Sequence, residues 1–172
     1  DGGWYYFDNS GYAVTGWNQI GGTWYYFDDM GTMYSDCWIS DEDDNIYLLT
    51  PSGAMFTGWF LDEGTYEEED GTIVEWSDYY YFASNGIMQK GWVKDGGIWY
   101  YLDPEYGYMY SDGVYEIGNN EYFFDESGAM MTGWCKQLWY IDEETGDVFY
   151  DWFYANSDGT LARGWKQVNG AW

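Results

Sequence analysis

The sequence lacks histidine altogether, and only five of its 172 residues are lysine or arginine. Without histidine, no Ser–His or Cys–His pair can form, which excludes the commonest arrangements for nucleophilic catalysis. Nucleic-acid and anionic-membrane surfaces depend on Lys and Arg, so we expect no nucleic-acid partner. The chain also lacks a long apolar run. We therefore expect no membrane insertion, and we place any secretion signal outside this segment.

Acidic residues account for most of the charge. Thirty-one acids give a net charge of −26, and because every base lies at or after Lys90, residues 1–89 contain no base. Such a field favours cationic partners, metal or organic, although a simpler interpretation is that the acids keep an aromatic-rich surface soluble. The runs Asp41–Asp44 and Glu67–Asp70 could gather Ca²⁺, but neither matches an EF-hand loop. We interpret both runs as solvated loops.

Neither the carboxylates nor the two cysteines indicate chemistry. Glycoside hydrolysis needs a carboxylate pair buried in a cleft that separates the two pKa values, and nothing in the pattern predicts such a cleft. Cys37 and Cys135 fit no zinc-binding spacing. We therefore predict no catalytic residue, no metal and no cofactor.

Aromatic residues, by contrast, make up 25% of the chain. The stretch Trp24–Met33 begins with four aromatics, which are typical of a pleated, half-buried strand. The Asp and Gly that follow supply turn chemistry, so we predict a hairpin in which residues 32–34 return along the strand and Thr32 lies opposite Phe27. We expect the turn aspartate, here Asp28, to cap its own turn. The same aspartate recurs as Asp8, Asp103, Asp125 and Asp142.

This stretch repeats along the chain. Its copies are marked by the turn glycines Gly11, Gly31, Gly53, Gly71, Gly86, Gly107, Gly128, Gly146 and Gly159. A period of about 20 residues indicates a repeat array rather than one globular core. We count eight or nine copies, because the one that ends at Gly71 is degenerate, and we interpret residues 60–78 as an irregular insertion.

A second element keeps the same period. A tryptophan, usually preceded by glycine, follows most of the turn glycines, as in Gly16-Trp17, Gly58-Trp59, Gly91-Trp92, Gly133-Trp134 and Gly164-Trp165. Seven residues after most of these tryptophans the next aromatic strand begins, and spacers such as residues 18–23 carry the Gly-Gly of a tight turn. No amphipathic helix pattern of useful length occurs, so we predict an all-β chain.

The unit Gly-Trp-x6-Trp-Tyr-Tyr-Phe-Asp-x-x-Gly-x-Met resembles the cell-wall-binding repeats of Gram-positive surface proteins, which include the choline-binding repeats of autolysins and phage lysins. Related repeats occur in glucan-binding domains and large clostridial toxins. The resemblance covers essentially the whole chain and implies a solenoid of stacked β-hairpins, roughly three to a turn, without catalysis. On this basis we treat residues 1–172 as one array from a longer protein. We also expect Cys37 and Cys135, which lie in distant hairpins, not to form a disulfide.

In the choline-binding repeats, the pocket lies between successive hairpins. It combines the Gly-Trp tryptophan, the first Trp of the next strand, a Tyr from the following hairpin and a nearby Met. Carried over, the resemblance selects Trp17, Trp24, Met33 and Tyr47; Trp92, Trp99, Met109 and Tyr122; and Trp134, Trp139 and Phe153. Such rings suit a quaternary ammonium or the face of a sugar. At other junctions Cys37 and Gly113 occupy the expected position of the Gly-Trp tryptophan, and Ile46 and Glu121 replace the strand's first Trp.

The resemblance thus implies a non-catalytic binding module that attaches a secreted protein to the bacterial cell wall or a surface glycan. Its expected partners are a choline-bearing cell-wall polymer or polysaccharide and other domains of the same larger protein. Two alternatives stay open. One is a structural stalk or spacer of a surface adhesin, in which every aromatic is core, and the other is an α-glucan-binding module.

Overall fold

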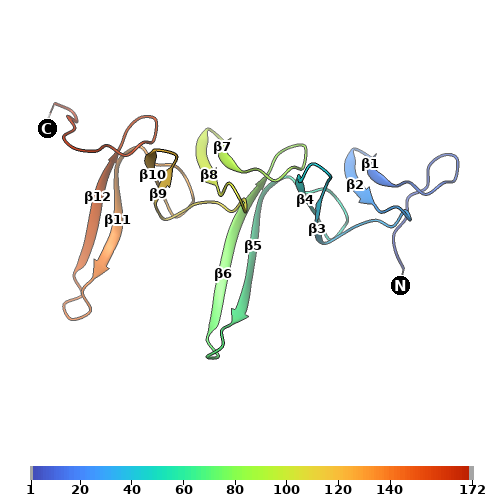
Figure 1. Cartoon of the computed structure of the whole chain (residues 1–172), viewed down its shortest axis with the longest axis horizontal. Coiled ribbons are helices and arrows are strands. Elements are labelled where there is room, and N and C mark those ends of the chain that lie inside the picture. The colour runs from blue at the N-terminus through green and yellow to red at the C-terminus, as the bar shows by residue number, and fades with distance from the viewer. Residues whose placement is uncertain (1, 171–172) are drawn as a thin grey trace. The chain divides into compact units, whose positions relative to one another are not determined.

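Antiparallel β-hairpins form the regular secondary structure of residues 2–170, the part of the chain that this computed structural model describes (Figure 1). The prediction of an all-β fold of β-hairpins is confirmed, because these residues form strands, turns and loops and contain no helix. Each of the six two-stranded sheets pairs consecutive strands. The hairpins are β1 (Gly16–Ile20) with β2 (Thr23–Phe27), β3 (Cys37–Ser40) with β4 (Ile46–Leu49), β5 (Gly58–Glu67) with β6 (Ile73–Phe82), β7 (Gly91–Asp95) with β8 (Ile98–Leu102), β9 (Gly113–Ile117) with β10 (Asn120–Phe124), and β11 (Gly133–Ile141) with β12 (Val148–Ala155). Within residues 2–170 there is no helix that could span a membrane.

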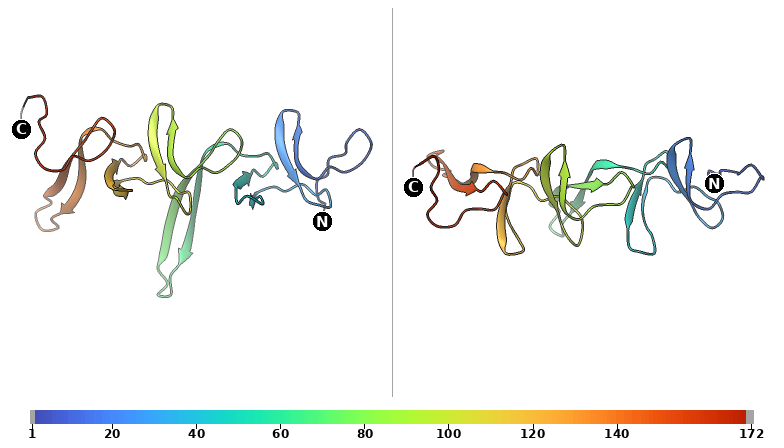
Figure 2. Two further views of the ribbon diagram at one scale, coloured as in Figure 1. Left: turned by 45° about the horizontal axis from the view of Figure 1, so that its top comes forward. Right: turned by 90° about the horizontal axis from the view of Figure 1, so that it is seen from above.

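The chain divides into two compact units, Asp1–Gln89 (unit 1) and Lys90–Trp172 (unit 2). Each unit holds two short hairpins followed by one long hairpin, which extends beyond the short ones of its unit (Figures 1 and 2). Equivalent positions lie 75 residues apart through most of the two units, as Gly16 and Gly91 do at the starts of β1 and β7. The larger repeat of this chain is therefore a group of three hairpins.

Each short hairpin joins a first strand to the aromatic strand that follows it. The register of β1 and β2 runs from Gly16 opposite Phe27 to Ile20 opposite Thr23, which leaves Gly21-Gly22 as a two-residue turn. Both glycines have positive φ, 60° and 90°, as a type I′ hairpin turn requires. The predicted hairpin of Trp24–Phe27 with residues 32–34 is reduced to a short return at the end of the strand, where the Tyr34 N–H bonds to the Tyr26 carbonyl oxygen at 2.9 Å. The tight Gly-Gly turn makes the preceding segment the main partner of the aromatic strand.

The segment after each aromatic strand is a compact loop. Asp28 Oδ1 accepts hydrogen bonds from the backbone N–H groups of Met30 (2.9 Å) and Thr32 (2.8 Å). The predicted capping role of this aspartate is confirmed. Asp8, Asp103, Asp125 and Asp142 bond to their own loops in the same way. The curled loop makes only one bridge to β2, in which Met33, not Thr32, lies opposite Phe27.

Within each unit, the loops after the second and third hairpins also tie their hairpin to the preceding one. Met55, in the loop after β4, donates its backbone N–H to the carbonyl oxygen of Trp24 in β2 at 2.8 Å. Met88, Met130 and Leu161 make equivalent bonds to Ile46, Trp99 and Glu121. The Met33 side chain in turn packs under the next loop, where a Cβ on Gly53 would lie 2.7 Å from its Sδ. Gly53 has φ of 81° as well, so both conformation and space demand glycine there.

The last residue of each aromatic strand forms the centre of the core. These residues are Phe27, Leu49, Phe82, Leu102, Phe124 and Ala155, and none is more than 2% exposed. In the long hairpin of unit 1, the register continues without a break from Gly58 opposite Phe82 to Glu67 opposite Ile73. Residues 60–78 thus form most of a regular hairpin, and the copy that ends at Gly71 is its tip. The copy that ends at Gly146 is likewise the tip of β11–β12.

Cys37 begins β3 opposite the last residue of β4. It therefore occupies the position that Gly16 has in β1, and Trp38 occupies that of Trp17. The loop before it contains one additional residue, and Asp36 there takes the positive φ (53°) that Gly16 (68°) takes in β1. Both cysteines are free thiols, and Cys135 is buried.

Candidate functional site: aromatic junctions between hairpins

One junction in each unit brings together aromatic rings from successive hairpins. In unit 1, Trp17 of β1 and Tyr47 of β4 have ring centroids 4.9 Å apart at 56°. In unit 2, Trp92 of β7 and Tyr122 of β10 are 4.8 Å apart at 70°. The two pairs occupy equivalent positions, and each borders a hollow that is open to solvent.

The hollow of unit 2, which we call the second junction pocket, has a volume of about 400 Å³ and is lined by Trp92, Trp99, Tyr122, Met130 and Asp158. The Trp92 and Trp99 rings are nearly perpendicular, at 89° with centroids 6.2 Å apart. Both tryptophans are more than a third exposed. Part of each ring therefore remains accessible to a ligand. Two rings that meet edge to face beside an open hollow can both contact a cation that lies in it.

Packing behind the pocket fixes the orientation of Trp92. Its ring contacts Tyr101 of β8 at 5.0 Å and Phe124 of β10 at 6.0 Å. Phe124 is fully buried. Trp92 thus belongs both to the wall of the pocket and to the edge of the core.

The first junction pocket is the hollow of unit 1, with a volume of about 410 Å³, lined by Trp17, Tyr26, Ile39, Ser40, Asp41, Glu42 and Tyr47. The Tyr47 hydroxyl donates a hydrogen bond to Asp41 Oδ2 at 2.9 Å. Hydrogen bonds, the strongest from the Asn45 side chain, lower the pKa of Asp41. Burial, followed by this carboxylate, raises the pKa of Tyr47. The pocket therefore combines aromatic walls with an ionised carboxylate.

Trp24 occupies the position in unit 1 that Trp99 occupies in unit 2. It lies opposite Gln19 in β1, as Trp99 lies opposite Lys94 in β7. Both tryptophans are 40% exposed. Trp24 does not line the first junction pocket, although its carbonyl oxygen accepts the bond from Met55 described above.

The methionines selected from the sequence lie one repeat away from the selected aromatics. The backbone N–H of Met33 bonds to Trp4, and its side chain lies under Gly53. Met109 bridges Leu102 across its own loop. The methionines that reach Trp24 and Trp99 are instead Met55 and Met130. These loops fold back onto the preceding hairpin of their unit, a long-range contact that spacing within one repeat does not reveal.

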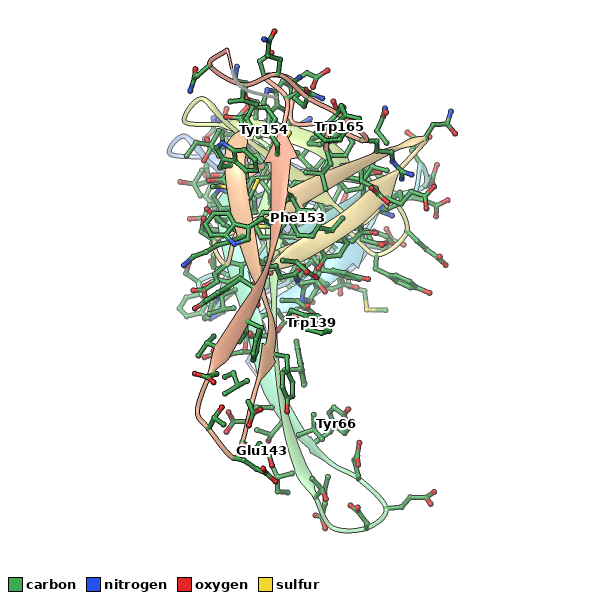
Figure 3. The ribbon with its side chains drawn as sticks, turned by 90° about the vertical axis from the view of Figure 1, so that its left-hand side faces the viewer. Tyr66, Trp139, Glu143, Phe153, Tyr154 and Trp165 are labelled. Atoms are coloured by element: carbon green, nitrogen blue, oxygen red, sulfur yellow. The ribbon has the colours of Figure 1, made fainter. Side chains whose placement is uncertain are left out.

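The structure does not bring the third set, Trp134, Trp139 and Phe153, together. Trp139 lies on the outer part of β11, 70% exposed, on the way to the hairpin tip at Glu143 and away from Phe153 (Figure 3). Phe153 stacks on Phe123 at 6.1 Å. Trp139 lies only five residues after Trp134, and in this long hairpin it is still in the same strand.

Trp152 holds the position that was expected for Trp139. It lies opposite Lys136 in the register of β11 and β12, as Trp99 lies opposite Lys94. Trp134 and Trp152 are 61% and 63% exposed. A count from the strand end at Ala155, rather than from Trp134, would have found this residue.

A second junction in each unit is filled by side chains. In unit 1, Leu48, Phe82 and Met88 form a buried cluster against Phe56, Phe60, Tyr80 and Ile46. In unit 2, Phe123, Cys135 and Ala155 pack against Val114, Met131, Phe153 and Leu161. Val114, not Gly113, occupies the tryptophan position there. Glu121 forms an ion pair with Arg163 at 2.8 Å. These junctions are packed with buried side chains and belong to the core.

The repeats match known repeat families along much of the chain. Residues 14–60 and 70–113 match the choline-binding repeat, and residues 1–13 and 114–130 match the putative cell wall binding repeat. The chain belongs to the choline-binding repeat family. The resemblance inferred from the sequence is therefore confirmed. No curated protein matches this choline-binding repeat chain.

Solved structures agree with the family assignment. Choline binding protein F from Streptococcus pneumoniae, crystallised in the presence of a peptidoglycan analogue (a tetrasaccharide-pentapeptide), is 34% identical, with a TM-score of 0.68 over 96% of this chain and 51% of that one. A complex of CbpF with ipratropium is 28% identical, with a TM-score of 0.66 over 94% and 42%. The modular autolysin LytC from Streptococcus pneumoniae is 27% identical, with a TM-score of 0.60 over 98% and 34%. The chain thus spans about half or less of the length of these relatives.

Proposed function

We propose that the chain is a non-catalytic module that attaches a larger, secreted protein to the bacterial cell wall at the cell surface. In this proposal residues 1–172 are one repeat array, and its junction pockets bind the quaternary ammonium groups of a choline-bearing cell-wall polymer. The observation that carries it is the set of Trp92, Trp99 and Tyr122 around one solvent-open hollow. The family assignment and the peptidoglycan analogue present with choline binding protein F support it.

The energetics favour many weak contacts over one strong one. A well-placed cation gains about 0.5–2 kcal/mol from each aromatic face. Two or three rings therefore give only weak affinity at one pocket, but a polymer that engages several pockets gains from effective concentration. The net charge of −26 adds an attraction for cations that salt weakens.

The filled junctions favour a second candidate, a structural stalk. The clusters around Phe82 and Phe123 show that aromatic positions of this repeat also serve as core. In a stalk, all the junction rings would act in this way. A third candidate, an α-glucan-binding module, would use the same exposed rings as platforms for sugar faces.

Ligand titration distinguishes the three candidates. Choline and, separately, a soluble α-glucan are titrated at low and at high salt while tryptophan fluorescence is followed. We expect choline to bind more weakly at high salt, because screening reduces the attraction to an acidic chain. Binding of the neutral glucan without salt dependence would favour the platform. The absence of any response would favour the stalk.

Trp92→Ala tests the site itself. We expect at least a tenfold loss of choline affinity at the second junction pocket, together with a destabilisation of about 3 kcal/mol from the lost packing. Trp99→Tyr keeps an aromatic wall and should cost less on both counts. Trp139→Ala, which removes an exposed ring outside both pockets, is the control. Unchanged choline affinity in Trp92→Ala would show that the site is misassigned.

A further inference from the structure

The two junction pockets border equivalent Trp–Tyr pairs, but they are lined by different positions of the repeat and differ in charge. Lys94 lies opposite Trp99, and Gln19 holds the same position opposite Trp24. The Lys94 ammonium lies over the Trp99 ring, with Nζ 5.3 Å from its centroid. Trp99 is itself a wall of the second junction pocket. Unit 1 offers no counterpart, because residues 1–89 contain no base.

The acids around the pockets increase this difference. Asp41 and Glu42 both line the first junction pocket, and none of its lining residues is a base. Among the residues that the structure describes, the acid that lines the second junction pocket is Asp158. Its Oδ1 accepts hydrogen bonds from the hydroxyl (2.7 Å) and backbone N–H (3.1 Å) of Thr160. The first junction pocket is thus acidic, whereas the second has one lining carboxylate and one ammonium beside it.

An ammonium on a pocket wall acts on a bound ligand in two ways. It repels a cation in the pocket, and it attracts an anionic group of the same ligand that extends past the ring. If the Lys94 ammonium and a charge on the ligand are roughly 10 Å apart, Coulomb's law gives a change in affinity between about twofold and about fifteenfold. The lower figure applies to an effective dielectric constant of about 80 and the higher figure to one of about 20. This range is large enough to measure and small enough to leave binding intact.

We propose that Lys94 is a specificity-determining residue of the second junction pocket. It shifts this pocket's preference from simple organic cations towards zwitterions that carry an anion close to a quaternary ammonium, while the first junction pocket prefers the simple cation. This inference rests on the proposed function, in which both pockets bind quaternary ammonium groups.

The test compares choline, a simple cation, with phosphocholine, which carries an anionic phosphate close to its quaternary ammonium, at each pocket. Binding is followed by NMR of the tryptophan indole N–H signals, so that Trp17 and Trp92 report on the two pockets separately. We expect Lys94→Gln to move the affinity ratio in the second junction pocket about twofold to fifteenfold towards choline. The ratio in the first junction pocket should stay as it is in the parent chain.

A charge-matched variant makes the test specific. Lys136→Gln removes the same charge from an ammonium that lies over Tyr150 instead, and should change neither ratio. If choline binds but Lys94→Gln leaves the ratio unaltered, this inference is overturned and the proposed function stands. If neither probe binds either pocket, the proposed function fails, and the inference with it.

Discussion

Units 1 and 2 have the same architecture and different surfaces. Each has two short hairpins and one long hairpin, one open aromatic junction and one filled junction. Yet residues 1–89 hold seventeen acids and no base, while residues 90–172 hold fourteen acids and all five bases. The charges lie mainly on loops and strand faces, whereas residues such as Phe27 and Leu102 end the strands in the core. In this chain, the positions that build the repeat are thus largely distinct from those that set its charge.

The long hairpins show the same contrast. The β5–β6 hairpin carries eight acids and no base over residues 58–82. The outer part of β11–β12 exposes more large apolar residues, namely Leu138, Trp139, Tyr140, Ile141, Val148, Phe149, Tyr150 and Trp152, whereas those on β5–β6 are Leu61, Tyr66, Ile73, Trp76 and Tyr79. A two-stranded ribbon has little packing of its own. Its outer part therefore tolerates either kind of surface.

If the two units share one architecture, the same substitution should cost the same in both. Gly53→Ala and Gly128→Ala each place a Cβ against a methionine of the preceding loop, at positions with φ of 81° and 79°. We expect each to lower the free energy of unfolding of its unit by about 2–4 kcal/mol, measured by urea denaturation.

Gly91→Ala is the matched control for these two variants. Its φ of 71° is similar, but a Cβ there would have no neighbour within 4 Å. Only the conformational strain of about 1–2 kcal/mol should remain. A large cost at Gly53 with a small one at Gly128 would mean that the units are not packed alike.

The long hairpin of unit 2 should divide into a core part and an outer part of unequal importance. Phe153 is half-buried and stacks on Phe123, so we expect Phe153→Ala to cost about 2–3 kcal/mol in urea denaturation. Trp139 is exposed, and its substitution by alanine should change stability by less than about 0.5 kcal/mol. If Trp139→Ala cost as much as Phe153→Ala, the outer part of β11–β12 would be packed rather than exposed.

Local chemistry explains which features the sequence revealed. Aromatic strands, Gly-Gly turns and loop aspartates such as Asp28 act over a few residues, so the all-β class, the repeats and the capping were predictable. So was the family, from the Gly-Trp spacing. The main strand pairing was not predictable, because the segments before and after residues 24–27 are both joined to them by turn residues. Only the tight Gly21-Gly22 turn favours the preceding segment.

The site was predictable only where the hairpins are short. The rule of seven residues between tryptophans holds for Trp92 and Trp99, but it breaks down at Trp134, where the strand continues. The methionine assignments failed for another reason, since Met55 and Met130 reach back to the preceding hairpin through a backbone bond. A contact between repeats has no signature within one repeat.

The smallest expected effect separates the two units at a single loop. In unit 2, Asp103 is buried, and the backbone N–H groups of Tyr106 and Glu105 outweigh that burial and lower the pKa of its carboxyl. Asp103 Oδ2 accepts a hydrogen bond from the Tyr110 hydroxyl at 3.0 Å. Burial, and then this carboxylate, raise the pKa of Tyr110 to about 12. In the part of unit 1 that the structure describes, the counterpart Tyr34 makes no such bond to Asp28.

We expect Tyr110→Phe to cost about 1 kcal/mol near neutral pH, the usual net contribution of one such hydrogen bond. Because the folded pKa of Tyr110 lies above its ordinary value of about 10, its contribution is present below pH 10 and is lost as pH rises towards 12. Because the pKa of Asp103 is lowered, its contribution is present above about pH 4 and is lost on acidification. Phenolate absorbance should show one tyrosine that titrates near pH 12 in the parent chain and is missing from Tyr110→Phe. Tyr34→Phe should keep that tyrosine and lose little stability, whereas an equal loss in both variants would remove this difference between the units.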